Sequence, residues 1–318
     1  MAQVAYLSHP DYELHVQGAG HPERPARVRA LREHLPKTDI WSKLTHLTPG
    51  IAPVETLDLV HDRSYIDFVK ELCERGGGYV GRDWTGTVQE SFVVARRAVG
   101  AVTRAVDAVL AGEADSAFCA IRPPGHHALR DRGMGFCLFN NVALGARYAQ
   151  RRHGVERVFI VDWDYHHGNG TQALFWTDPT VFFFSVHCYP AWPYTGRQDE
   201  VGAGAGKGAT LNAPLPPGAG RDEYLAVFDD VLRPAFERFR PDLVFISAGF
   251  DAHAEDPVPR QSRKNMKLAA EDFRALTERV RELAEGSARG RLVSVLEGGY
   301  HLPSLVRSVE EHLRGLLA

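Results

Sequence analysis

Short runs of apolar residues alternate with longer amphipathic stretches over most of the chain. The short runs have the length of strands and lie at residues 116–121, 158–161, 181–186, 243–247 and 292–296. The longer stretches repeat apolar residues at helical spacing and lie at 88–112, 141–153, 222–240 and 267–286. Apolar strands that are separated by helices predict a parallel sheet with helices packed on both of its faces.

Glycine and proline gather in two segments, 75–82 and 202–220, and we interpret both as surface loops within one domain. No repeat or low-complexity segment divides the chain, and 318 residues fit one large α/β domain. We therefore predict an α/β fold: a single open domain of three layers, α/β/α, with a mostly parallel sheet over residues 1–318.

The composition is that of an ordinary globular enzyme, and it lacks the excess of basic residues that is typical of nucleic-acid-binding proteins. Hydrophobic residues make up 44% of the chain, and 37 Lys and Arg against 40 Asp and Glu leave a net charge of −3. The N-terminus lacks the pattern of a signal peptide, and no apolar run approaches the ~20 residues of a membrane-spanning helix. We expect a cytoplasmic protein with no nucleic-acid or membrane partner, and homo-oligomerisation stays open. The cysteines lack paired spacing and are expected to be reduced and mostly buried: Cys73, Cys119, Cys137 and Cys188.

Four of the predicted strands run directly into reactive side chains. These strands are followed by RPPGHHA, DWDYHHGNG, AGFDAH and EGGY, in that order along the chain. In open α/β sheets, ligands bind beyond the carboxyl ends of the strands. The coincidence of four such ends predicts one shared site.

Asp162, Asp164 and His166 alternate along DWDYHHGNG, so on an extended segment they share one face. A carboxylate and an imidazole at this spacing suit a divalent metal, and Asp251 at another strand end is the candidate third ligand. Two carboxylates and one imidazole leave positions open for water and substrate, as catalytic zinc requires. Taken alone, Asp-x-Asp-x-His has an alternative interpretation as a hydrogen-bonded polar loop.

His126 and His127 follow the rigid RPPG turn, and Tyr300 follows two glycines. An imidazole beside a metal can accept a proton from water and later return it to a leaving amine, with Asp162 and Asn169 as candidate partners that fix the tautomers. The Tyr300 hydroxyl can hydrogen-bond a developing oxyanion. Taken singly, solvated histidines and a packing tyrosine are the alternatives.

Together these motifs resemble the histone deacetylase family. RPPGHHA, GMGFCLFNN, DWDYHHGNGTQ, SAGFDAH and LEGGY occur in this order, and the resemblance extends from HPERPARV at 21–28 to GGYHL at 298–302. It is closer to class II and to bacterial deacetylase or acetylpolyamine amidohydrolase relatives than to class I, in part because Asn169 stands where class I members carry aspartate. The resemblance implies an arginase/deacetylase-like fold and a zinc-dependent amidohydrolase that removes acetyl or related acyl groups from acetyl-lysine, acetylpolyamines or other small acyl amides.

Carried over by position, the resemblance also implies the role of each reactive residue. A metal-activated water attacks the amide carbonyl, His127 is general base and acid, and Tyr300 stabilises the oxyanion. His126 is the electrostatic neighbour of His127 and is oriented by Asp162, while Asn169 lies beside His127. The implied ligands of one catalytic zinc ion are Asp164, His166 and Asp251.

Further residues match positions that contact substrate or a second ion. The narrow acyl-lysine tunnel is implied to be walled by Gly135, Phe136 and Trp192. A structural potassium ion is implied to be held, largely through backbone carbonyls, by Asp162, Asp164, His166, Ser185 and Val186.

Two positions depart from the pattern of the family. Asp83 is shifted by about one residue from an aspartate that grips the substrate backbone, and Val258 stands where polyamine-specific members carry a glutamate, although Glu255 and Asp256 are near. Two other functions remain as alternatives. An arginase-like binuclear manganese ureohydrolase needs more carboxylate ligands, and a catalytically silent acyl-lysine binder should lack one of the reactive residues.

Overall fold

The computed structural model describes residues 2–81, 83–258 and 265–318. Its centre is an eight-stranded sheet in which every neighbouring pair of strands is parallel. Across the sheet the order is β2 (Leu44–Leu47), β1 (Val4–Leu7), β5 (Ser116–Cys119), β10 (Leu292–Leu296), β9 (Leu243–Ala248), β6 (Val158–Asp162), β7 (Val181–Cys188) and β8 (Thr210–Leu215).

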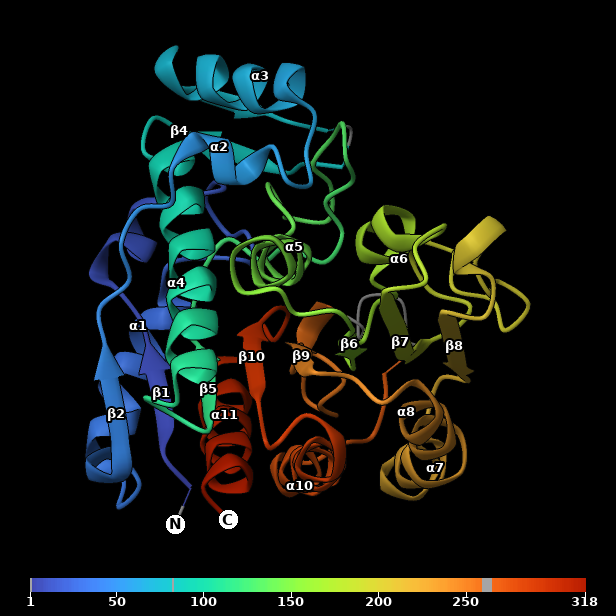
Figure 1. Ribbon diagram of the computed structural model, residues 1–318. Coiled ribbons are helices and arrows are strands. Elements are labelled where there is room, and N and C mark those ends of the chain that lie inside the picture. Colours follow the sequence, from blue (N-terminus) through green and yellow to red (C-terminus); the bar gives the residue numbers. More distant parts are fainter. Residues whose placement is uncertain (1, 82, 259–264) are drawn as a thin grey trace.

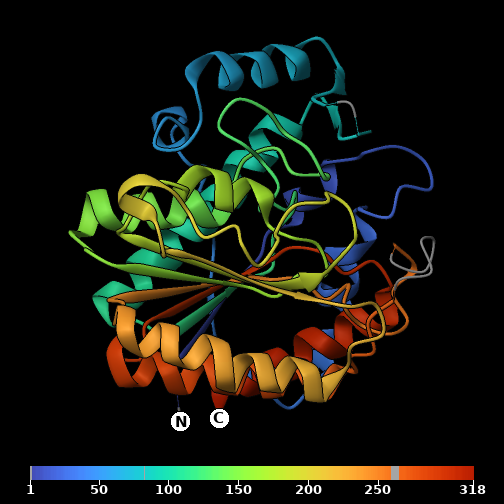
Figure 2. The same cartoon turned by 90° about the vertical axis from the view of Figure 1, so that its right-hand side faces the viewer.

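Helices cover both faces of the sheet (Figures 1 and 2). The upper layer of Figure 1 contains α4 (Ser91–Ala111), α5 (Asn141–His153) and α6 (Asn169–Phe175), with α2 (Val54–Leu57) and α3 (Arg63–Glu74) above them. The lower layer contains α7 (Arg221–Val227), α8 (Arg233–Phe239), α10 (Ala270–Ser287) and α11 (Leu302–Leu317), and α1 (Ala26–His34) packs against α11. The predicted open α/β/α fold with a parallel sheet is therefore confirmed.

The central strands read as continuous apolar runs because helices bury both of their faces. Every residue of β5, β6, β9 and β10 is buried. The predicted helix at 141–153 has the same bounds as α5. It begins where the Asn140 side chain accepts the Ala143 N–H at 3.0 Å, and it ends at Gly154, whose φ of 69° glycine tolerates without strain.

The prediction that 75–82 and 202–220 are loops is wrong in part. The second segment contains β8, a half-polar edge strand with Pro214 that pairs with β7. Such a strand lacks the apolar run by which a buried strand is recognised. In the first segment, β3 (Gly77–Tyr79) pairs antiparallel with β4 (Gly86–Val88), and residue 82 lies outside the described residues.

The helices differ from prediction mainly at their ends. The stretch expected at 222–240 is α7 and α8 joined by a π-helical turn, Phe228–Leu232, and the stretch expected at 88–112 begins three residues late, in α4. Within the described part of the chain, no helix is long and apolar enough to cross a membrane. All four cysteines are buried and free of disulfides, as expected.

Sheet order explains why reactive residues from distant segments can meet. The four strands that were predicted to end in reactive side chains, β5, β10, β9 and β6, are consecutive neighbours at the middle of the sheet. All four run in the same direction, so their carboxyl ends lie at one edge, which is on the right in Figure 2. The site is built at this edge.

Candidate active site

Asp164, His166 and Asp251 converge at the ends of β6 and β9. Their ligand atoms all lie within 4.8 Å of one another. His166 Nδ1 is 3.2 Å from Asp164 Oδ1 and 3.1 Å from Asp251 Oδ2. Backbone N–H groups hold the carboxylates in place: Gly298 donates to Asp164 Oδ2 at 2.8 Å, and Tyr165 donates to Asp251 Oδ1 at 3.0 Å.

The charge of this cluster fits a divalent cation. Burial and the neighbouring Asp164 raise the pKa of Asp251. Although burial alone would raise it, the charges of His126 and His166 hold the pKa of Asp164 well below its usual range. Among the described residues, buried Asp251 Oδ2 has no hydrogen-bond partner, and its nearest basic neighbour is His166 Nδ1 at 3.1 Å. Two carboxylates and an imidazole with an unused buried oxygen form a donor set of the kind that zinc takes.

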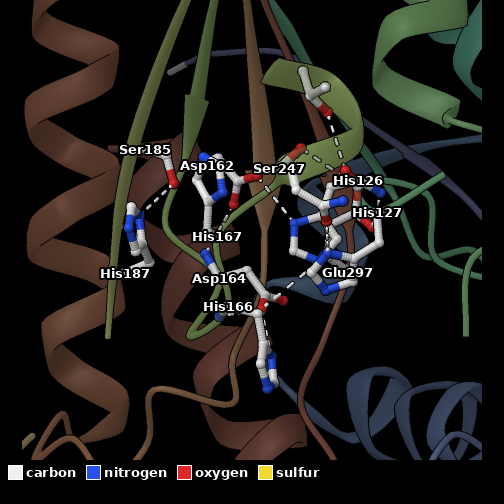
Figure 3. A network of polar contacts seen from close by, with 12 residues as sticks. His126, His127, Asp162, Asp164, His166, His167, Ser185, His187, Ser247 and Glu297 are labelled. Carbon is white, nitrogen blue, oxygen red and sulfur yellow. Dashed lines mark hydrogen bonds and ion pairs between the residues drawn. The ribbon is translucent and has the colours of Figure 1, made fainter. Parts of the chain in front are cut away.

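His126 and His127 lie in the loop that follows β5, and His126 is beside Asp162 and Asp164 (Figure 3). His126 Nδ1 lies 3.0 Å from Asp162 Oδ2, and His127 Nδ1 lies 2.8 Å from Asn169 Oδ1. The two rings are 3.9 Å apart, and the His127 ring is 5.8 Å from that of His166. The oxygen partner fixes the proton of His127 on Nδ1, so that Nε2 is left as an acceptor.

The two imidazoles differ in charge. Burial opposes protonation of His126, but the charges of Asp162, Asp164 and Glu297 raise its pKa to about 10. Burial and the charges of His126 and His166 hold the pKa of His127 well below its ordinary value. These opposite shifts favour a protonated His126 and a neutral His127.

Glu297 was not among the residues predicted from the sequence. It is fully buried, and its Oε2 accepts the N–H of Gly125 at 2.7 Å and that of His126 at 3.2 Å. Burial raises its pKa to about 7. The available signal was its position at the end of β10, directly before Gly-Gly.

The turn that carries Tyr300 packs against the carboxylates of the cluster. A Cβ atom on Gly298 would lie 2.5 Å from Asp251 Oδ2 and 2.6 Å from Asp164 Oδ2, so this approach requires glycine. Tyr300 is 7% exposed, and Arg27 lies over its ring at 5.0 Å. Arg27, which was also missed, donates from Nε to Gly299 O at 2.6 Å; its signal was the HPERPARV motif.

Gly135, Phe136 and Trp192 lie directly outside this cluster. The Trp192 ring is 4.6 Å from His127, and Phe136 is edge-on to Tyr300 at 6.0 Å. A Cβ atom on Gly135 would lie 2.3 Å from the His127 ring and 2.6 Å from that of Trp192. Only a residue without a side chain fits between these rings. Asp83 accepts the Gly135 N–H behind this wall.

Asp162 also borders a second group of polar residues. It is the register partner of Ser185 across β6 and β7, and Val186 follows on the same strand. The Ser185 hydroxyl is 2.9 Å from His187 Nδ1, and burial lowers the pKa of His187 to about 3. In the view of Figure 3, Ser185 and His187 lie on the opposite side of Asp162 from His126.

Comparison with known proteins identifies the same family that the sequence motifs resemble. Residues 21–316 match the histone deacetylase domain. A histone deacetylase-like amidohydrolase of Pseudomonas aeruginosa is 43% identical over 304 residues, which are 94% of this chain and 78% of the relative. The human polyamine deacetylase HDAC10 is 40% identical over 298 residues, covering 90% of this chain and 43% of the relative.

Comparison with solved structures also finds a closely similar fold. The crystal structure of the HDA15 HD domain superposes with a TM-score of 0.92 at 32% identity, covering 99% of this chain and 88% of that one. The domain match, the sequence identities and the shared fold are thus in agreement. The chain belongs to the histone deacetylase family, and is a hydrolase that deacylates amines.

Proposed function

We propose that this chain is a zinc-dependent amidohydrolase that removes acetyl or related acyl groups from acetyl-lysine, acetylpolyamines or similar amines. The observation that carries the proposal is the placement of the ligand cluster beside a neutral His127 and the Tyr300 turn. Held by Asp164, His166 and Asp251, zinc would polarise the acyl carbonyl and lower the pKa of a water. The deacetylase names of the relatives support this chemistry.

The residues of the chain divide the proton transfers between them. His127 Nε2 accepts a proton from the attacking water while Asn169 holds the other ring nitrogen. The water oxygen forms the new C–O bond, and the Tyr300 hydroxyl donates to the carbonyl oxygen as it becomes negative. His127 then gives its proton to the amine nitrogen as the C–N bond breaks. The products are a carboxylate and a free amine, and the His126 cation stays paired with Asp162.

We further propose that potassium binds where the ends of β6 and β7 adjoin. The register pairing of Asp162 with Ser185 brings backbone carbonyls of both strands near the turn that follows β6. The residues that would hold this ion are Asp162, Asp164, His166, Ser185 and Val186.

A substrate panel tests the proposed function. Purified protein is incubated with acetyl-lysine peptides, acetylputrescine, acetylspermidine and longer acyl-lysines, before and after chelation and zinc replacement. We expect hydrolysis of members of this panel, with loss on chelation and recovery with zinc. Binding of acyl-lysine without turnover would favour a silent binder, and two manganese ions per chain with urea release would favour the arginase-like alternative.

Zinc content reports on the ligand assignment directly. We expect about one zinc per chain in the wild type and a large loss in Asp251→Ala, because the remaining carboxylate and imidazole leave too few ligands for tight binding. Elemental analysis of dialysed protein measures this. Asp272→Ala is the matched control, since Asp272 is a buried carboxylate that accepts the Ala269 N–H at the start of α10. Undiminished zinc in Asp251→Ala would contradict the assignment.

Substrate affinity reports on the tunnel. Trp192→Ala should raise KM for acetyl-lysine substrates about two- to tenfold, since one aromatic contact contributes about 0.5–1.5 kcal/mol. Trp41→Ala is the control, because Trp41 packs on Tyr6 and His46 near β1 and β2. A KM for Trp192→Ala that is equal to or below the wild-type value would show that this ring does not line the substrate path.

A further inference from the structure

Asp256 is a buried carboxylate that has no place in the proposed mechanism. It is 1% exposed and follows the metal-ligand residue Asp251 by five positions. Its Oδ2 accepts the N–H of Tyr300 at 2.6 Å and that of His301 at 3.2 Å, and its Oδ1 accepts the N–H of Val258 at 3.1 Å. One side chain therefore holds the backbone of Tyr300 from a loop that is 44 residues distant in sequence.

The Tyr300 side chain is buried, but few polar contacts restrain it. Its hydroxyl forms no hydrogen bond with a residue that the structure describes, and its ring meets Arg27 at 5.0 Å and Phe136 at 6.0 Å. The two residues before it are glycines, and Gly299 has a φ of 114°. Because glycine leaves the backbone free to move, the direction of the ring depends on the bonds that fix the Tyr300 peptide.

The side chains of Arg27 and Asp256 both hydrogen-bond the backbone of that turn. Arg27 donates hydrogen bonds to two carbonyl groups of the turn, from Nη2 to Glu297 O at 2.5 Å and from Nε to Gly299 O at 2.6 Å. Asp256 accepts hydrogen bonds from the N–H groups of Tyr300 and His301. A second contact lies beside it, because the Ser304 hydroxyl in the first turn of α11 donates to Glu255 Oε2 at 3.1 Å. The loop after β9 and the turn after β10 are thus fastened together next to the metal-ligating carboxylates.

We propose that Asp256 is a positioning residue that sets the Tyr300 hydroxyl relative to the ligand cluster. It touches no reacting atom and acts through the Tyr300 backbone. The inference rests on the proposed oxyanion role of Tyr300. A donor that acts in the transition state must be placed within a fraction of an ångström, and about 1 Å of misplacement can cost about 10²-fold in rate.

Asp256→Asn is the first test, because it preserves size while replacing one acceptor with a donor. The single amide oxygen of asparagine cannot accept hydrogen bonds both from Val258 and from the Tyr300 turn. At least one of the hydrogen bonds that connect the two loops is therefore lost or weakened. We expect kcat to fall about tenfold, with KM within about twofold of wild type, because the tunnel walls are unchanged. Asp256→Ser, which keeps one acceptor, is the second variant if the first does not fold.

A double-mutant cycle separates positioning from a general loss of stability. Asp256→Asn is combined with Tyr300→Phe, and kcat, KM, zinc content and Tm are measured for all four proteins. If Asp256 acts through the hydroxyl, Asp256→Asn should change kcat by less than about twofold once the hydroxyl is absent. The control is Asp178→Asn, whose carboxylate accepts the Thr180 N–H at 2.8 Å just before β7, at the opposite edge of the sheet.

The outcomes distinguish the positioning role of Asp256 from the oxyanion role of Tyr300. Equal losses of kcat from Asp256→Asn in both backgrounds, or a single variant within about twofold of wild type, would overturn the positioning role alone. A Tyr300→Phe enzyme within about threefold of wild type would overturn the oxyanion role, and the positioning role with it.

Discussion

Replacing His127 with alanine is expected to lower kcat by about 10²–10⁴-fold while zinc binding and KM stay close to wild type. The residue is a neutral imidazole beside the ligand cluster, and it is the group that both accepts and returns the proton in the proposed reaction. Alanine removes this transfer in both directions. It leaves the ligands themselves in place, since no ligand residue hydrogen-bonds the His127 ring.

Steady-state kinetics with a fluorogenic acetyl-lysine substrate, together with zinc analysis, measure this effect. The matched control is His312→Ala. His312 is a fully buried imidazole that bonds Thr277 and Ser294, neither of which has a role in the proposed mechanism, so its loss should cost stability and spare kcat. Turnover near wild type in His127→Ala would remove this residue from the mechanism.

Tyr300→Phe should lower kcat and kcat/KM together by about 10²–10³-fold, or about 2.7–4 kcal/mol of transition-state stabilisation. Hydrolysis converts a neutral carbonyl into an oxyanion, so a hydroxyl aimed at that oxygen gains strength as charge develops. Phenylalanine keeps the ring and its contacts with Arg27 and Phe136, so the loss reports on one oxygen atom.

Tyr224→Phe provides the control for removing a hydroxyl from a buried tyrosine. The Tyr224 hydroxyl is buried and has no hydrogen-bond partner among the described residues, so its removal should leave both constants unchanged. Saturating zinc is used throughout, to separate chemistry from metal occupancy. If Tyr300→Phe retained activity within about threefold of wild type, the tyrosine would be a packing residue.

The strands that build the site could be predicted because they are buried on both faces. Each is an apolar run followed at once by glycine and reactive side chains, so fold class and strand ends could be predicted together. Edge strands carry less of this signal. In β2 only Leu44 is buried, and β8 mixes buried with partly exposed residues, so neither has a long apolar run.

Site residues could be proposed from sequence where their chemistry is unusual. Paired histidines and alternating carboxylates attract attention because structural explanations for them are few. Glu297 and Asp256 act instead as acceptors for backbone N–H groups 172 and 44 residues distant in sequence. No spacing or composition marks such a bond, because its partner is defined only when the strands have been brought together.

The sheet order bears on how the protein assembles as it is synthesised. Among the described strands β10 comes last along the chain, yet it lies between β5 and β9. Until it is inserted, β2, β1 and β5 form one half of the sheet, and β9, β6, β7 and β8 form the other, each with an unpaired inner edge. The histidine pair follows a strand of the first half, and the proposed zinc ligands follow strands of the second. Among the described strands, the one latest in sequence therefore joins the half with His127 to the half with the proposed zinc ligands, and pairing over such long sequence separations is intrinsically slow.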